Sequence, residues 1–336
     1  MKHSKGSGHR NLRCQRVFPQ HIFSPGSLGR LGGAALLAIL ALHGSPGLAQ
    51  DSALDPFTPA DATSLGLAGT GRASPTNLDN VWYGSSVLAL DSQYDIHGSG
   101  FLTPGGWRGF EVAAVDSRTS RLALGLAYTY MQHADMPMLD SELPGWELVG
   151  QSHDNPTAAQ HVSAGAAMSV DSDRRLCLGL HGGYFWRRAG RAGDGSGFRL
   201  GGSISGRPHE TLALSLGTTW PLLVDGARGY EDQARVDAGL RWEPVQGLGL
   251  LADAMLPIDE LDGVDFGLGA EYVVAELVPL RVGWSRNAGD VRHALGAGVG
   301  VASEYLNLQY GIWVDLGPTD DALAPPTHGL TLALVM

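Results

Sequence analysis

The sequence predicts an all-β fold: a fourteen-stranded antiparallel up-and-down transmembrane β-barrel with an N-terminal plug segment. Three observations predict it. Apolar residues alternate with small or polar ones over long stretches, as in residues 122–130 (LALGLAYTY), the connections between stretches are alternately short and long, and large aromatic residues gather near stretch ends. Strict alternation indicates strands with one apolar face. Most of these stretches reach the roughly 9–11 residues that a tilted strand needs to cross a bilayer.

The expected strands are 92–102, 107–116, 120–131, 160–170, 175–186, 197–206, 210–220, 233–243, 247–256, 263–273, 278–286, 291–301, 304–315 and 327–336. Every second connection is short (117–119, 171–174, 207–209, 244–246, 274–277 and 302–303), whereas all the long ones (132–159, 187–196, 221–232 and 316–326) fall between these. Short periplasmic turns at one end and long external loops at the other are typical of outer-membrane barrels.

The large aromatic residues are expected to form two interfacial belts. Tyr128, Tyr184 and Trp220 close strands that run toward the long connections, and Trp242 and Tyr272 close strands that run the other way. Such belts are typical of membrane barrels. A soluble exported β-sandwich, the alternative fold, would bury its aromatic residues in the middle of its strands.

Residues 1–49 are expected to be a signal peptide. They carry basic residues but no acidic one, an apolar core at 34–42, and small residues at 47 and 49, so we expect cleavage near Ala49, before Gln50. Nine apolar residues are too few for a helix that spans about 30 Å of hydrocarbon. The expected organisation is therefore a signal peptide over 1–49, a leader and plug over 50–90, and the barrel over 91–336, located in the outer membrane of a Gram-negative cell.

The mature chain is strongly acidic. Six of the 23 basic residues and none of the 34 acidic residues lie in residues 1–49, which leaves a formal charge of −17 on the rest. This balance argues against nucleic acid as a partner. Only Cys177 remains after processing, so an internal disulfide is excluded, and a closed hydrogen-bonded barrel would supply the rigidity instead.

Residues 64–90 (SLGLAGTGRASPTNLDNVWYGSSVLAL) form the expected plug. They follow a polar leader with two prolines, are rich in Gly, Ala, Ser and Asn, and alternate at neither the strand period nor the helix period. Small residues suit close packing inside a barrel. We expect Arg72 and Asp79 to anchor this segment to charged residues of the barrel wall.

With the apolar face directed to lipid, strand parity directs the opposite, small and polar face to the lumen. Parity places a set of charged residues on this inner face: Arg199, Arg235, Asp237, Arg241, Asp253, Asp265, Glu271 and Arg281, with Glu111, His161 and His181. Neighbouring strands lie about 4.8 Å apart, so opposite charges on this wall can pair. The wall is either a polar channel or docking surface for the plug, or a salt-bridge network that serves only structure.

No enzyme, metal or cofactor signature is present. The glycine-rich stretch 66–74 lacks the Lys and the Ser or Thr of a phosphate loop, the histidines show no HxH or HExxH spacing, and no GxSxG motif occurs. Acidic residues in 132–159 would at most bind Ca²⁺ weakly. The expectation is a non-enzyme with no catalytic residue, metal or cofactor.

The plug resembles the start of FadL-like and PorV-like outer-membrane proteins, whose pattern runs approximately LGMGGAxxAxxDDxxAxxxNPAxLA. Matching positions include Leu65-Gly66, Ala68-Gly69, Gly71, Ala73, Asp79-Asn80, Val81-Trp82-Tyr83 and Leu88-Ala89, and phrases at 248–253, 269–272 and 279–284 are similar to the same families. The resemblance implies a fourteen-stranded barrel in which Gly66, Gly69, Gly71, Arg72, Asp79, Asn80 and Tyr83 belong to the plug. Residues 84–86 are Gly-Ser-Ser where the family has Asn-Pro-Ala, and the chain ends on Met336 rather than on an aromatic residue.

Two functions follow from the resemblance. The first is a passive, FadL-like channel or porin for small hydrophobic molecules, which would meet the loops 132–159, 187–196 and 221–232 and leave by displacement of the plug or through a lateral gap. The alternative is a PorV-like structural or secretion-accessory barrel that binds a protein of a secretion system. In both, the other partner is outer-membrane lipid.

Overall fold

The computed structural model describes residues 61–103, 107–133, 158–188, 194–226, 234–258, 263–287, 292–316 and 326–336. The expected signal peptide lies outside these residues, and so does at least half of each expected long connection. Three short helices come first, α2 (Ala62–Gly66), α3 (Asn80–Tyr83) and the 3₁₀ helix η1 (Ser85–Ala89). In the described part of the chain, no helix is long and apolar enough to span a membrane.

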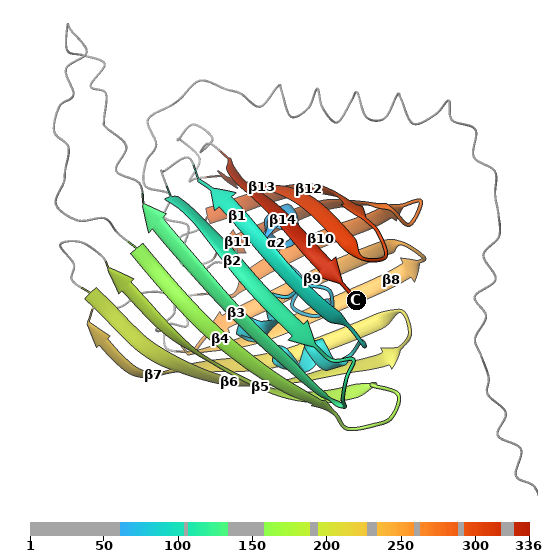
Figure 1. Ribbon diagram of the computed structural model, residues 1–336, viewed down its shortest axis with the longest axis horizontal. Coiled ribbons are helices and arrows are strands. Elements are labelled where there is room, and N and C mark those ends of the chain that lie inside the picture. The colour runs from blue at the N-terminus through green and yellow to red at the C-terminus, as the bar shows by residue number, and fades with distance from the viewer. Residues whose placement is uncertain are drawn as a thin grey trace, which may run out of the picture. The chain divides into compact units, whose positions relative to one another are not determined.

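Fourteen antiparallel strands follow and close into a barrel in which every strand pairs with its neighbours in sequence and β1 pairs with β14 (Figure 1). The strands are β1 (Tyr94–Leu102), β2 (Trp107–Asp116), β3 (Leu122–His133), β4 (Ala158–Ser169), β5 (Leu176–Arg188), β6 (Asp194–His209), β7 (Leu212–Gly226), β8 (Arg235–Val245), β9 (Leu248–Pro257), β10 (Asp265–Val274), β11 (Val278–Asn287), β12 (Arg292–Ala302), β13 (Leu306–Leu316) and β14 (Thr327–Val335). The predicted all-β class, the closed antiparallel barrel and the strand count are confirmed.

Strand boundaries match the prediction within three residues, with one exception. β7 continues to Gly226 through Pro221, six residues beyond the expected end, and pairs with β6 as far as Gly195↔Gly226. The predicted loop 221–232 is therefore wrong for its first six residues. Register shifts between Ser196 and Phe198 and between Gly206 and His209 mark irregular pairing of β6 with β7, a feature that alternation alone does not reveal.

The two faces of the wall follow the predicted parity. Leu126, Leu180 and Val282 point outward and are at least 60% exposed, whereas their neighbours Ala127 and His181 are buried. An exposed apolar exterior that surrounds a polar interior is the organisation of a transmembrane barrel. The short turns, such as 170–175, 246–247 and 275–277, lie together at one end, which is called the short-turn end below.

Residues 61–91, called the lumen segment below, lie inside the barrel. Its helices contact two different parts of the barrel: α2 contacts β11 to β14, whereas α3 and η1 contact β3 to β7. Its apolar residues Val81, Val87 and Leu88 form one buried cluster with inward alanines of β2, β3, β4 and β7. In Figure 1 the segment appears in blue and cyan between the front and rear strands. It joins β1 at the short-turn end, where Gln93 pairs with Ser117.

Candidate functional site

The lumen segment lies directly on glycines of the inner wall. A Cβ on Gly283 would be 2.1 Å from the backbone carbonyl of Leu67, and one on Gly311 would be 2.2 Å from Ala62 O. Both distances are far below any real contact. Further inward glycines that a Cβ would bring against the segment are Gly125, Gly165, Gly179, Gly217, Gly239, Gly267, Gly269, Gly296 and Gly298. The glycine content of the wall therefore provides the space that the segment backbone occupies.

The segment begins with a capped helix and a tight turn. The Asp61 carboxylate accepts a hydrogen bond from Ser64 N at 2.6 Å and caps α2. After α2 the backbone turns through positive φ angles at Ala68 (51°), Gly69 (77°) and Gly71 (133°). At Gly71 a side chain would also meet Asn77 Nδ2 at 2.9 Å, so this position requires glycine.

Arg72 connects the segment to the charged wall. Asp253 Oδ2 on β9 accepts hydrogen bonds from the backbone N–H groups of Gly71 (2.7 Å) and Arg72 (3.0 Å). The Arg72 guanidinium pairs with Asp237 on β8 at 3.3 Å, and Asp237 also pairs with Arg235 at 3.5 Å. Arg72, Arg235, Asp237 and Asp253 are thereby brought together as one charged contact between segment and wall.

Tyr83 lies among three guanidinium groups. The Cζ atoms of Arg235, Arg72 and Arg199 lie 4.5, 4.7 and 5.8 Å from the centre of its ring. Such contacts are favourable because the ring face is electronegative. Burial raises the pKa of the Tyr83 hydroxyl to about 12, although the three arginines oppose this shift. The neighbouring Trp82 ring lies 4.0 Å from the His161 ring.

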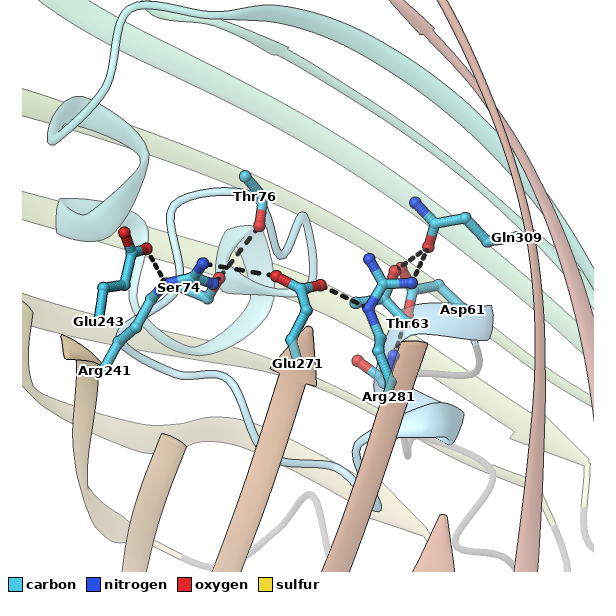
Figure 2. A network of polar contacts seen from close by, with 10 residues as sticks. Asp61, Thr63, Ser74, Thr76, Arg241, Glu243, Glu271, Arg281 and Gln309 are labelled. Atoms are coloured by element: carbon cyan, nitrogen blue, oxygen red, sulfur yellow. Dashed lines mark hydrogen bonds and ion pairs between the residues drawn. The ribbon is translucent and has the colours of Figure 1, made fainter. Parts of the chain in front are cut away.

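A second polar network joins the segment to β8, β10, β11 and β13 (Figure 2). Glu271 accepts a hydrogen bond from Arg281 at 2.7 Å and one from Arg241 at 3.4 Å. Arg241 lies on β8, two strands from Glu271 on β10. Its side chain reaches Glu271 by passing over Gly249 of β9, where an added Cβ would be 3.3 Å from the guanidinium. Its Nη1 donates to Ser74 Oγ of the segment at 2.7 Å.

The network continues on the other side of Glu271. Arg281 donates to Gln309 Oε1 at 3.0 Å, and the Thr63 hydroxyl of the segment donates to the same oxygen. Both ends of the network therefore terminate on the segment, at Ser74 and at Thr63. The two arginines share the Glu271 carboxylate, and each is linked to a segment hydroxyl, Arg241 directly to Ser74 and Arg281 through Gln309 to Thr63.

Asp79 has a different environment from the expected one. Its carboxylate accepts a hydrogen bond from the Ser64 hydroxyl within the segment, and its Oδ1 has no hydrogen-bond partner among the described residues. Burial raises its pKa well above the usual carboxyl value, and the nearby carboxyls of Asp61 and Glu111 add to this shift, whereas Ser64 and Arg72 oppose it. Asp79 thus braces the fold of the segment rather than pairing with a wall arginine.

The other predicted residues occupy varied positions. Asn80 Nδ2 donates to Ser74 O at 2.8 Å and so closes a turn of the segment. Gly66 lies against Gly298, where an added Cβ would be 3.0 Å from the Gly298 Cα. Asp265 begins β10 opposite Met255.

Several contact residues were missed by the sequence reasoning. Gln309 was identifiable, because strand parity in β13 directs it inward with Asn307 and Gly311. Thr63, Ser64 and Ser74 had no such signal, because they lie in a segment without periodicity. Only the folded segment directs the Thr63 and Ser74 hydroxyls to the wall and the Ser64 hydroxyl to Asp79.

The arrangement defines a class: a closed, outward-apolar transmembrane barrel whose lumen holds an N-terminal segment. Within the described residues, no group of three or more metal-binding side chains is found. The contacts between the segment and the wall are hydrogen bonds, ion pairs and backbone packing, so the segment is held by noncovalent interactions alone.

The sequence and the structure were compared with known proteins. No protein-family model and no curated protein matches the sequence. Solved structures with the same fold include the toluene transporter TbuX of Ralstonia pickettii (13% identity, 83% of this chain and 98% of that chain, TM-score 0.55). The toluene transporter TodX of Pseudomonas putida is 12% identical over 82% of this chain and 96% of its own (TM-score 0.57).

The monoaromatic hydrocarbon channel CymD is 12% identical over 83% of this chain and 97% of its own, with a TM-score of 0.58. At such identities the likeness establishes the fold. It confirms the predicted FadL-like resemblance at that level. The PorV-like alternative gains no support from these structures.

Proposed function

We propose that this chain is a passive outer-membrane channel for small hydrophobic molecules and that the lumen segment is its plug. The observation that carries the proposal is the buried segment itself, which is seated on inward glycines and tied to the wall by Arg72, Ser74 and Thr63. A barrel that served only as a scaffold could fill its lumen with its own side chains. Displacement of the lumen segment would instead open a path through the barrel.

The fold agreement supports transport as the activity, since TbuX and TodX are described as toluene transporters and CymD as a hydrocarbon channel. Passage by displacement of the plug is the favoured route. All neighbouring pairs of the fourteen described strands are hydrogen-bonded, and the described strands contain no lateral gap.

Deletion of residues 64–90 tests the proposal. The mature protein is expected to fractionate with the outer membrane and to migrate fast on SDS-PAGE unless boiled. The deletion variant should keep this migration but raise both ion conductance in planar bilayers and uptake of toluene into proteoliposomes. A matched control is Gly98→Ala, an outward position where an added Cβ meets no atom within 4 Å, so that the plug stays in place. Unchanged conductance after plug deletion would contradict the plug, and complete solubility without detergent would contradict the barrel.

A further inference from the structure

A cavity lies beside the lumen segment near the short-turn end. Its volume is about 200 Å³, and its lining includes Pro75 and Thr76 of the segment, Ala213 of β7, and Arg241 and Glu243 of β8. Most of the other lining residues are polar, among them Arg207, which pairs with Asp91 at 2.8 Å. This is the side of the barrel formed by β6 to β8.

The cavity coincides with a change in how the segment meets the wall. Against β5, β11 and β13 the backbone is in direct contact with Gly179, Gly283 and Gly311, with no space for a methyl group. At residues 74–76 the segment instead turns without a helix, and the wall presents Ala213 and charged side chains. Space is left between segment and wall because the turn is not seated on glycine.

Arg241 lies where the cavity meets the segment. It lines the cavity and also donates to Ser74 Oγ at 2.7 Å, while Glu243 accepts from its Nε at 2.8 Å (Figure 2). The turn that Arg241 holds is otherwise tied to neighbouring parts of the chain: Asn80 donates to Ser74 O, and Gln93 donates to Pro75 O. Loss of the Arg241 contact would therefore remove the hydrogen bond that ties the turn to β8, while the Thr63 contact of α2 remains.

We propose that molecules leave the barrel at the short-turn end through this cavity, between the turn 74–76 and strands β7 and β8, and that the contact of Arg241 with Ser74 keeps this path closed. The inference rests on the proposed channel function. A path lined by charged side chains suits compact molecules of small apolar area, because a long alkyl chain would expose each of its methylenes to a polar wall. The substrate class that fits is thus a compact hydrophobic compound rather than a long-chain one.

Ion conductance tests the path without any hydrophobic substrate. In planar bilayers, Arg241→Ala should raise the open fraction by about tenfold, as expected for loss of a charge-assisted hydrogen bond. Ser74→Ala removes the same contact from the segment side and should act in the same direction. If Arg241→Ala lacks heat-modifiable migration and is therefore not folded, the Ser74→Ala variant tests the path instead.

Blockade then locates the path. In the Arg241→Ala background, Thr76→Cys modified with a bulky thiol reagent should return the conductance to the unsubstituted level, since Thr76 is exposed in the cavity. Ser92→Cys, exposed near the same end but outside the cavity lining, is the matched control and should leave the raised conductance unchanged. The protein with only its buried Cys177 controls for the native thiol.

Two results overturn the inference: normal conductance in folded Arg241→Ala and Ser74→Ala variants, or a raised conductance that modified Thr76→Cys does not block. Either result leaves the plug-deletion test of the channel untouched. If plug deletion raises toluene uptake while these variants behave as the unsubstituted protein, the channel stands and the exit lies elsewhere.

Discussion

The Glu271 carboxylate on β10 lies 2.7 Å from Arg281 Nε on β11 and 3.4 Å from Arg241 Nη2 on β8, so one buried acid serves a buried arginine and a partly exposed one. Its side chain is 10% exposed. Removing one partner of a buried ion pair leaves the other charge without compensation. Glu271 is therefore the central residue of the network that joins wall and segment.

Glu271→Gln should lower the free energy of unfolding by about 3 kcal/mol, because two arginines lose their shared counter-charge. Glu243→Gln is the matched control: that carboxylate pairs with the same Arg241 but is 43% exposed, and its loss should cost less than about 1 kcal/mol. The measurement is the urea concentration at which the fast-migrating form disappears on unheated SDS-PAGE. Equal effects of the two variants would contradict a central role for Glu271.

Gly283→Ala should displace the lumen segment, since the new Cβ would lie 2.1 Å from the Leu67 carbonyl and overpacking of this kind costs about 1–3 kcal/mol. Limited trypsin digestion measures the displacement as faster cleavage after Arg72. Gly98→Ala is the control, because no atom lies within 4 Å of a Cβ at that outward position. Protection of Arg72 in both variants would argue that the segment does not rest on Gly283.

Asp79→Asn should stabilise the protein at alkaline pH. The folded-state pKa of Asp79 is raised, so folding favours the protonated carboxyl. The resulting destabilisation is absent below the ordinary carboxyl pKa of about 4 and grows as pH rises above it. Urea unfolding at pH 4 and pH 8 should show a gain for Asp79→Asn at pH 8 only. A gain of equal size at both pH values would mean that ionisation of Asp79 is not the cause.

Tyr83→Ala should destabilise the segment by about 3 kcal/mol through loss of a partly buried ring whose faces contact three guanidinium groups. Tyr83→Phe keeps both ring faces and should cost about 1 kcal/mol or less. Conductance provides a second readout, with Tyr83→Ala expected to open more often than Tyr83→Phe. If the phenylalanine variant is as unstable as the alanine variant, the hydroxyl rather than the ring holds the arginines.

Most of the fold was predictable because a strand repeats every two residues. Parity in residues 120–131 directed Leu126 outward and Ala127 inward, as the structure has them. The short turn at 275–277 then sets Glu271 opposite Arg281. The prediction was wrong at β7, where irregular pairing carries the strand to Gly226, because a register shift leaves no regular signal in the sequence.

Much less of the candidate site was predictable. The charged wall followed from parity. The sequence predicted that Arg72 would contact charged residues of the wall, but it did not predict that these residues would be Asp237 and Asp253. Asp79 bonds within the segment instead of with the wall. A segment without periodicity offers no rule for where its hydroxyls and amides point.

The sequence by itself determined the barrel, its strand count and which side chains face the lumen, because alternation is a local property of each strand. Only the tertiary structure decided what those inward side chains meet. The reach of Arg241 over Gly249 to Glu271, the seating of the segment on Gly283 and Gly311, and the cavity at Thr76 all join residues far apart in the chain. Such contacts exist only once the wall has closed around the segment, because closure sets which residues of distant strands face one another across the lumen.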